Sequence, residues 1–339
     1  MKIAFLNIYQ NKVSRGAETF VTELFRRLSK NNKVDVISQN KELPKRIPIL
    51  WKLFLDPQGL IIFWFTLKNI PRILKEKYDV VVTLNGGWQP ALVRIVTWLY
   101  GGKMVISGQS GIGWDDRNNL WCFPNAFVAL SSKALSWAKK VMPAVRSFYV
   151  PNGVDLEKFT LKGESFKVLL KKPIVLAVGA FTEQKRMDLA IKAVAKLRDV
   201  SLLMVGGGGD LKEKLSEEGK RLLGGRFELT SIPFEKMPEV YKSADVFTLP
   251  SVPSEAFGNV LVEAMASGLP VVATNDPIRR EIVGDAGFFV DPTNTDEYSK
   301  VLGAVLKTNW DDKPRKQAEK FSWDRIGERY NNLFRELIK

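Results

Sequence analysis

PSVPSEAFGNVLVEAMASGLP, residues 250–270, is the stretch that decides the fold of this sequence. It follows an apolar run, Val246–Leu249, that predicts a strand, and it continues into a helix predicted over Gly258–Ser267. Gly258 allows close backbone approach, so we expect the start of this helix to bind an anion. The donors would be the backbone N–H groups of Phe257, Gly258, Asn259 and Val260. A strand that leads into a helix through an anion site is typical of doubly wound α/β domains.

Two acidic residues flank this expected anion site. Glu255 precedes the helix and Glu263 lies inside it, up to roughly 12 Å further along at 1.5 Å per residue. With a diphosphate at the helix N-terminus, one acid would contact sugar hydroxyls and the other the ribose hydroxyls. The plain alternative is that Glu255 only caps the helix dipole and that Glu263 is a surface residue. Apolar residues surround Glu263 in the sequence, and an acid in that setting needs a partner, which favours the binding interpretation.

Short apolar runs rich in β-branched residues alternate with longer helix-period segments along the chain. This alternation predicts parallel sheets with helices on both faces. Strands are predicted in the first half over Ile3–Leu6, Val34–Ile37, Val80–Thr83, Met104–Ser107, Ala126–Leu130 and Phe148–Val150. Strands are predicted in the second half over Ile174–Val178, Leu202–Val205, Phe227–Leu229, Val246–Leu249, Val271–Ala273 and Phe288–Val290. Helices between them include Ala17–Ser29, Met187–Leu197 and Met237–Ser243.

The series of strands and helices occurs twice, because Pro151–Asp155 interrupts it and a polar stretch to Lys172 follows. At 339 residues the chain is long enough for two separate cores. We therefore predict an α/β protein of two doubly wound, Rossmann-like domains that face a central cleft, over residues 1–155 and 156–321. Ligands in such sheets lie at the carboxyl ends of the strands.

The composition excludes several kinds of chemistry. The chain has no histidine and a single cysteine, Cys122, so an internal disulfide is excluded and a structural zinc site is not expected. Chemistry must use carboxylates, Lys, Arg, amides and backbone N–H groups. The first residues read as a buried strand rather than a secretory signal, and the longest apolar run, Gly59–Leu67, is far shorter than the roughly 20 residues that span a bilayer. We expect a cytoplasmic protein.

The positive charge is concentrated in the first half. Residues 1–160 contain 23 Lys and Arg against 11 Asp and Glu, a net +12, whereas residues 161–339 contain 28 against 26, a net +2. This asymmetry indicates an anionic partner for the first half, such as a membrane surface, a lipid phosphate or a nucleic acid. A solvated basic face without a partner is the plain alternative. No nucleic-acid motif is visible, so we expect no nucleic-acid partner.

The two acids and their surroundings resemble the signature of retaining glycosyltransferases of family 4, which have the GT-B fold. The resemblance rests on the Glu255-x7-Glu263 spacing with Phe257-Gly258 inside it and EAMASGLPVV after it. Further matches occur in the same order along nearly the whole chain. They are Gly16-Ala17-Glu18 at the first helix, VPNGVD at residues 150–155, Val178-Gly179 leading to Lys185-Arg186, and FSWDRI at residues 321–326. The last resembles the start of the family's closing helix, which predicts that residues 322–339 cross back onto the first domain.

The resemblance implies a role for each matching residue. Glu255 would hold hydroxyls of the transferred sugar, and Glu263 would hold the ribose. Lys185 would offset charge developing on the diphosphate, and Gly179 belongs to the same phosphate-binding segment. Gly16 would let the first domain's backbone reach the phosphates once the cleft closes. Ile232 is expected near the nucleotide base.

Two positions depart from the family pattern. An Arg commonly follows the strand-ending glycine and joins the Lys on the phosphates, but here Ala180 stands there; Arg186 is the candidate to compensate. The family's sugar-contacting His matches Gln109, which donates a hydrogen bond but carries no proton. In the mechanism proposed for this fold the leaving phosphate itself takes the acceptor's proton, so transfer does not require that His. We therefore place Gln109 with Glu255 and Lys185 among the catalytic candidates.

The glycine run at residues 206–209 resembles part of a dinucleotide-binding fingerprint. The third glycine of that pattern would fall at position 211, which is Leu211, so the pattern is not complete. We interpret this run as a donor-side loop near the diphosphate.

The acceptor side is suggested by aromatic and basic residues between Pro44 and Lys77. Lys45 and Arg46 precede Leu50–Phe54, and Leu60–Phe65 contains Trp64. Such mixtures suit a membrane interface, where rings insert and cations meet anionic headgroups. The alternative is that these residues belong to the hydrophobic core. We favour the core for Leu60–Phe65, and for Leu50–Phe54 we favour neither interpretation over the other.

These observations predict a retaining glycosyltransferase. It would move a hexose-type sugar from a nucleotide-diphosphate sugar to a saccharide or lipid-linked acceptor in glycan or polysaccharide assembly, with no cofactor and no obligatory metal. Peripheral attachment to the inner face of the plasma membrane is part of this hypothesis. The alternatives are a catalytically weak or inactive nucleotide-sugar-binding homologue, and a sugar-nucleotide epimerase or hydrolase of the same fold.

Overall fold

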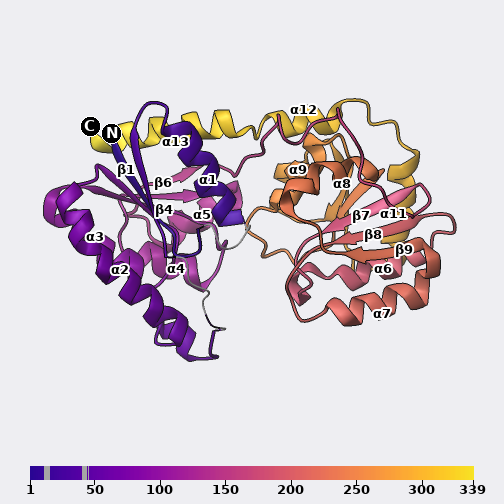
Figure 1. The fold of residues 1–339 in the computed structure, drawn as a ribbon, viewed down its shortest axis with the longest axis horizontal. Helices are drawn as coiled ribbons and strands as arrows, with labels where there is room; N and C mark the ends of the chain where they lie inside the picture. The colour runs from indigo at the N-terminus through magenta and orange to yellow at the C-terminus, as the bar shows by residue number, and fades with distance from the viewer. Residues whose placement is uncertain (11–15, 40–43, 45) are drawn as a thin grey trace. The chain divides into compact units, whose positions relative to one another are not determined.

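Two six-stranded parallel sheets organise the chain in the computed structural model, which describes residues 1–10, 16–39, 44 and 46–339 (Figure 1). The chain divides into two units. Unit 1 is Met1–Asn152 with Trp323–Lys339, and unit 2 is Gly153–Ser322. The sequence placed the division after residue 155 and gave 322–339 to the first domain. The fold class, a doubly wound parallel α/β architecture occurring twice, is confirmed.

Unit 1 has the strand order β2-β1-β3-β4-β5-β6. Its strands are β1 (Lys2–Leu6), β2 (Lys33–Ile37), β3 (Val80–Thr83), β4 (Lys103–Ser107), β5 (Ala126–Ala129) and β6 (Ser147–Tyr149). Its helices are α1 (Gly16–Leu28), η1 (Leu50–Leu53), α2 (Pro57–Glu76), α3 (Trp88–Tyr100), α4 (Trp114–Trp121), α5 (Ser132–Val141) and α13 (Trp323–Ile338).

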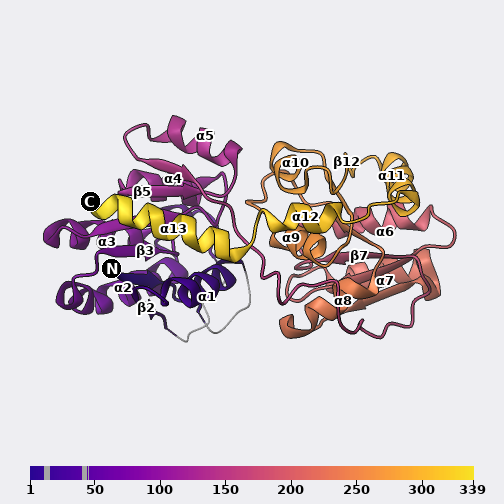
Figure 2. The same ribbon diagram turned by 90° about the horizontal axis from the view of Figure 1, so that it is seen from above.

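Strand alternation divides the core of unit 1 between the two faces of its sheet. Ile3 and Phe5 of β1 join the cluster that contains α1 and α13, whereas Ala4 and Leu6 join the cluster that contains α2 and α3. Figures 1 and 2 show α13 lying along the sheet of unit 1. Trp323 and Tyr330 of α13 contact Phe20 of α1, with ring centroids 6.2 and 5.4 Å apart. The last helix is therefore part of the core of unit 1.

Unit 2 has the strand order β12-β11-β10-β7-β8-β9. Its strands are β7 (Ile174–Val178), β8 (Ser201–Val205), β9 (Phe227–Thr230), β10 (Val246–Leu249), β11 (Val271–Thr274) and β12 (Gly287–Val290). Its α-helices are α6 (Met187–Ala195), α7 (Lys212–Leu223), α8 (Met237–Ser243), α9 (Asn259–Ala266), α10 (Pro277–Val283), α11 (Thr295–Lys307) and α12 (Lys313–Glu319). Its short 3-10 helices are η2 (Glu183–Lys185), η3 (Gly224–Arg226) and η4 (Phe234–Lys236).

The order of strands in unit 2 determines where a ligand would be expected. The direction of winding reverses between β10 and β7, which are hydrogen-bonded neighbours. Ligands in open α/β sheets bind outside the carboxyl ends of the strands at such a reversal. The loops that leave β7 and β10 contain Gly179 to Arg186 and Pro250 to Gly258, so the predicted binding residues lie where the topology favours a site.

Candidate functional site

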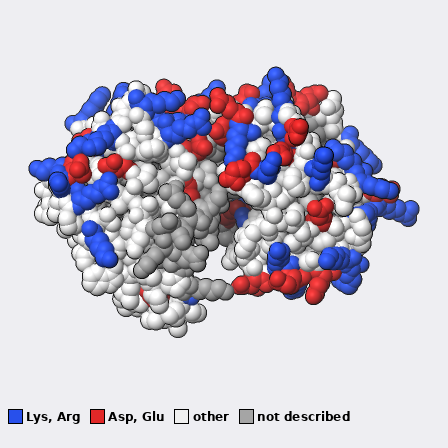
Figure 3. Space-filling view, viewed as in Figure 1, with Lys and Arg blue, Asp and Glu red and all other residues white. Residues whose placement is uncertain are grey.

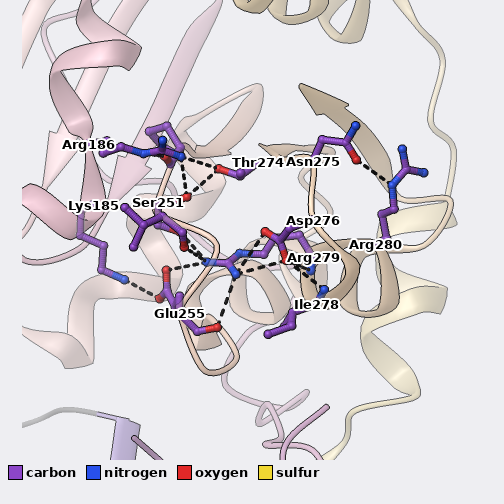
Figure 4. Close-up of polar contacts among 12 residues, drawn as sticks. Lys185, Arg186, Ser251, Glu255, Thr274, Asn275, Asp276, Ile278, Arg279 and Arg280 are labelled. Atoms are coloured by element: carbon purple, nitrogen blue, oxygen red, sulfur yellow. Dashed lines mark hydrogen bonds and ion pairs between the residues drawn. The ribbon is translucent and has the colours of Figure 1, made fainter. Parts of the chain in front are cut away.

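Glu255 and Lys185 meet at the carboxyl edge of the sheet in unit 2 (Figure 4). The Lys185 Nζ atom lies 2.5 Å from Glu255 Oε1, and both side chains are mostly buried. The backbone joins the same two loops, because the Val252 N–H donates to Gln184 O at 2.9 Å. The structure therefore brings together two residues that are 70 positions apart and that the sequence assigned to one ligand.

Glycines let the neighbouring loops approach this pair. A Cβ atom on Gly179 would lie 3.3 Å from Lys185 Cε, so the lysine side chain passes over the end of β7. A Cβ atom on Gly206 would lie 1.9 Å from Gly179 O, which no side chain tolerates. Gly206 follows β8, and Ser231, which follows β9, donates to Gly206 O at 2.6 Å. Close backbone packing beside Lys185 thus explains the first glycine of the run after β8.

Arg279 holds Glu255 from the opposite side to Lys185, and sequence reasoning missed it. It lies in α10, is fully buried, and places Nη2 3.3 Å from Glu255 Oε2 (Figure 4). Burial by itself raises the pKa of Glu255, but the charges of Lys185 and Arg279 outweigh it and lower that pKa below the usual value. Glu255 is therefore a carboxylate held by two cations. In the sequence, only the Asp276-Pro277 start of a helix marks the surroundings of Arg279.

Arg186 has a different environment from the one expected. Its guanidinium donates to Pro250 O at 2.8 Å and to Ser251 O at 2.9 Å, and its Nη2 atom lies 3.4 Å from Thr274 Oγ1. Burial lowers the pKa of Arg186. These contacts fasten the loop after β10, so the guanidinium would have to exchange them to replace the Arg missing at Ala180. The role of Arg186 on the phosphates stays a prediction.

Glu263 lies inside the fold and has a specific partner. It is 8% exposed, and Tyr241 Oη donates to Glu263 Oε2 at 2.8 Å. Burial raises the pKa of Glu263 to about 7, while Tyr241 and the more distant charge of Lys158 act in the lowering direction. The surface-residue alternative is wrong, since the side chain is buried. Its contact with a ribose stays a prediction.

The start of α9 follows Gly258, whose φ of 92° lies in the left-handed region that favours glycine. The preceding residue, Phe257, is buried and packs edge-on against Phe321 with ring centroids 5.8 Å apart. Any contact of Phe257 with a ligand would therefore be made by its backbone. Asn259 and Val260, in the first turn of α9, are half-buried, and the positive end of the helix dipole lies there. Ile232, also half-buried, lies in the loop after β9.

Two of the predicted residues, Gln109 and Gly16, belong to unit 1. Gln109 follows β4 and exchanges two hydrogen bonds of 3.0 Å with the buried carboxamide of Asn152. It also donates to Ser107 Oγ at 2.9 Å. Gly16 is the first residue of α1. The role of Gln109 with a sugar stays a prediction, and its carboxamide would have to exchange Asn152 for that ligand.

Nothing in the described part of the chain forms a group of three or more His, Cys, Asp or Glu residues that could hold a metal ion. Within the same residues, no helix has the length and apolar character needed to cross a membrane.

Two family profiles divide the chain between them. The profile described as Glycosyltransferase Family 4 matches residues 14–158, and the one described as Glycosyl transferases group 1 matches residues 162–322. A curated relative, the phosphatidyl-myo-inositol mannosyltransferase of Mycolicibacterium smegmatis, is 32% identical over 187 residues, covering 53% of this chain and 48% of the relative. The chain spans about half the length of the curated relatives it matches first.

Solved structures agree over almost the whole chain. Sucrose-phosphate synthase from Thermosynechococcus elongatus has a TM-score of 0.77 at 20% identity, with 99% of this chain and 98% of that one covered. The Anabaena protein HepE in complex with UDP-glucose also has a TM-score of 0.77, at 18% identity, with 99% and 100% covered. At these identities the likeness concerns the fold alone.

Proposed function

The chain belongs to the glycosyltransferases, with a family 4 segment followed by a group 1 segment, and we propose that it transfers a hexose-type sugar from a nucleotide-diphosphate sugar with retention of configuration. The acceptor in this proposal is a saccharide or a lipid-linked saccharide in glycan assembly. The observation that carries the proposal is the Glu255 carboxylate, which lies between Lys185 and Arg279 at the carboxyl edge of the sheet.

The proposed donor site uses three features of unit 2. The first turn of α9 would bind the diphosphate, since helix N-termini stabilise anions. Lys185 would move from Glu255 to the diphosphate and offset the charge that develops as the nucleotide leaves. Glu255, a hydrogen-bond acceptor, would then orient the hydroxyls of the sugar. The UDP-glucose complex of HepE supports a nucleotide sugar as ligand.

Proton transfer in this proposal does not depend on a side-chain base. The chain contains no histidine. Gln109, at the position where the family has a histidine, cannot take up or release a proton. The leaving diphosphate would therefore accept the acceptor's proton on the face from which it departs, which also retains the configuration of the sugar. No obligatory metal is proposed, because Lys185 and the dipole of α9 supply positive charge at the diphosphate.

The first test is a thermal-shift panel of UDP-, GDP- and ADP-sugars, followed by transfer assays on lipid extract with the anomeric configuration of the product read by NMR. We expect one nucleotide to stabilise the protein and the product to keep the donor's configuration. An inverted product, or no stabilisation by any nucleotide sugar, would contradict the proposal.

Two substitutions then distinguish the proposed roles of Glu255 and Glu263. Glu255→Ala should reduce transfer about a hundredfold or more, as loss of a transition-state contact does, with a small effect on nucleotide affinity. Glu263→Ala should mainly weaken nucleotide binding. Isothermal titration and initial rates measure both quantities, and negligible effects from both substitutions would remove the site assignment.

An inactive nucleotide-sugar-binding protein is the second candidate. Two observations favour it: Ala180 stands where the family commonly has an Arg, and the carboxamide of Gln109 is engaged by Asn152. The same panel distinguishes the two candidates, since this one predicts stabilisation by a nucleotide sugar and no transfer to any acceptor in the extract.

The membrane part of the proposal is supported by an apolar surface on unit 1. Helices α2 and α3 pack together, and every exposed side chain of α3 is apolar: Trp88, Ile95, Trp98 and Leu99. Trp98 is 72% exposed and Trp64 of α2 is 57% exposed. Figure 3 shows few charged side chains at the lower left, where Figure 1 places these helices. An exposed apolar patch of this kind marks an interaction surface.

Basic residues of α2 border this apolar surface. Lys68, Arg72 and Lys75 are exposed, and the first half of the chain carries the net +12. Rings beside cations suit an anionic lipid surface, and the curated relative named above acts, by its name, on phosphatidyl-myo-inositol. Of the two segments singled out in the sequence, Leu60–Phe65 buries Ile62 and Phe65, whereas Leu50 and Leu53 of η1 are exposed. Lys45 lies outside the described residues.

Vesicle flotation tests the membrane proposal. We expect binding to vesicles with anionic lipid and less binding to neutral ones, because both charge and apolar area contribute. The double substitution Trp98→Ser, Leu99→Ser should lower the bound fraction, whereas Leu169→Ser, at a fully exposed leucine of unit 2, should not. Absence of binding to either vesicle would contradict the proposal.

A further inference from the structure

Arg279 is a charged side chain with no access to solvent. Burial of a guanidinium is costly unless charges and hydrogen bonds compensate it. Here Asp276 supplies one carboxylate, with Oδ2 3.2 Å from Arg279 Nη1, and Glu255 supplies the other. Asp276 is itself fixed, since it caps α10 by accepting from the N–H groups of Ile278 and Arg279. The guanidinium is therefore held rigidly from the α10 side.

From that fixed position Arg279 reaches three residues of the loop that carries Glu255. Its Nη2 atom donates to Ser251 Oγ and to Val252 O, each at 2.9 Å (Figure 4). Its Nη1 atom lies 3.4 Å from Glu255 O, and Nη2 also reaches the Glu255 carboxylate. One side chain thus binds both the backbone and the carboxylate of the residue on which the proposed donor site depends.

Arg279 and Lys185 differ in how free they are to leave Glu255. Lys185 is 21% exposed on a flexible stem, whereas Arg279 is 0% exposed and fixed by several contacts. An incoming diphosphate would attract Lys185, and Glu255 would then lose one of its two cations. A mostly buried carboxylate without a cation tends to take up a proton, and it would then lose its negative charge and one acceptor oxygen.

We propose that Arg279 is a positioning residue that keeps the Glu255 carboxylate charged and in place while Lys185 exchanges Glu255 for the donor's diphosphate. The identity of the diphosphate rests on the proposed function, but the effect of Arg279 on Glu255 does not. The charged groups around Glu255 are Lys185 from η2 and Arg279 from α10, with Asp276 and Arg186 one contact further away.

The first experiment measures the Glu255 carboxyl directly, without any donor. Glutamate labelled with ¹³C at Cδ is titrated by NMR, and Glu255→Gln assigns the signal. Lys185→Met imitates the state in which the lysine has left. We expect the Glu255 pKa to rise modestly in the single variant Lys185→Met. In the double variant, which combines Lys185→Met with Arg279→Met, it should rise by at least about one further unit, because the last cation is then gone. Equal values in the two variants would overturn the proposal, whether or not the protein is a transferase.

The second experiment tests whether the effect of Arg279 on the Glu255 carboxylate matters for sugar transfer. In Arg279→Met the acid limb of the kcat profile should move to higher pH, so that kcat at pH 6 falls about tenfold relative to its value at pH 8, with less than a threefold change in the donor KM. Arg279→Lys, which keeps the charge, should restore most of the rate. If Arg279→Met does not fold, Arg279→Gln replaces it in both experiments.

A matched control separates positioning of the carboxylate from anchoring of the loop. Arg186 binds carbonyls of the same loop but makes no described contact with the Glu255 carboxylate. Arg186→Met should lower thermal stability and leave the acid limb at the wild-type pH. An equal pH shift in the Arg186 and Arg279 variants, or a uniform loss of rate at every pH in Arg279→Met, would reduce Arg279 to a structural role.

Discussion

Glu263 is a buried acid whose partner the sequence could not identify. Apolar residues of α9 surround it, and the sequence indicated only that such an acid needs a partner. The partner, Tyr241, comes from α8, 22 residues earlier, and no local pattern connects the two. Arg279 is a similar case, because its burial depends on a loop 24 residues away in sequence. Residue types and spacing could predict which acids matter, but not which side chains hold them.

The raised pKa of Glu263 predicts a pH-dependent stability of unit 2. Folded Glu263 has a pKa of about 7, against 4.5 as the ordinary value. Between these values the folded chain holds a proton that the unfolded chain has released, so stability falls as pH rises. Glu263→Gln keeps an acceptor for Tyr241 and removes this titration. It should therefore be more stable than the wild type at pH 8, by at most about 3 kcal/mol, and similar at pH 4.5.

Urea unfolding at pH 4.5 and pH 8 checks this prediction. Glu235→Gln, on the surface of the same unit, is the control and should follow the wild type at both values. A stability difference between Glu263→Gln and wild type that does not change with pH would contradict it.

At the scale of elements, the strands were predictable because each is short and mostly apolar, and β7, at the centre of its sheet, is apolar throughout. The bounds predicted for β3, β7 and β10 match the structure, and β11 extends one residue further, to Thr274. Helix ends were less certain, because capping and packing set them: α6 ends at Ala195, two residues before the predicted end. The apolar outer face of α3 was not predicted from the sequence, because a helix that is apolar on all sides is ordinarily interpreted as buried.

In the loop after β8, substitution of one glycine, Gly206, should be harmful, and substitution of the next, Gly207, should be tolerated. Gly206→Ala would place a methyl group 1.9 Å from Gly179 O, so the backbone beside Lys185 must move. Gly207→Ala meets nothing within 4 Å. We expect Gly206→Ala to cost about 1–3 kcal/mol of stability and to weaken nucleotide binding, and Gly207→Ala to change both little. Thermal unfolding and nucleotide titration measure the difference, and equal behaviour of the two variants would count against this packing.

At the scale of the molecule, the prediction of two units rested on a series of strands and helices that occurs twice, and unit 2 begins at Gly153, inside the interruption at Pro151–Asp155. Residue patterns alone could not assign the last helix to unit 1. That assignment needed the resemblance to a family, because Trp323 and Tyr330 find their partner Phe20 some 300 residues earlier.

The two deeply buried tryptophans predict which unit each one stabilises. Trp323 lies in the core of unit 1 and Trp310 in the core of unit 2. Trp323→Ala should destabilise by about 3–5 kcal/mol and raise hydrogen exchange in β1 and β3, with unit 2 unchanged. Trp310→Ala should raise exchange in β7 and β8 instead. Exchange measured by mass spectrometry checks both, and a uniform increase over the whole chain in either variant would contradict the division.

The packing of α13 on α1 also has a consequence for the nascent chain. Residues 1–152 emerge from the ribosomal tunnel first. The segment that completes their core, Trp323–Ile338, emerges only after the 170 residues of unit 2. Unit 2 is continuous and can fold as soon as it has left the tunnel. Unit 1 must wait, with the apolar side of α1 uncovered, for as long as that insertion takes to translate. A chaperone that protects emerging chains would therefore be needed most by the half that is made first.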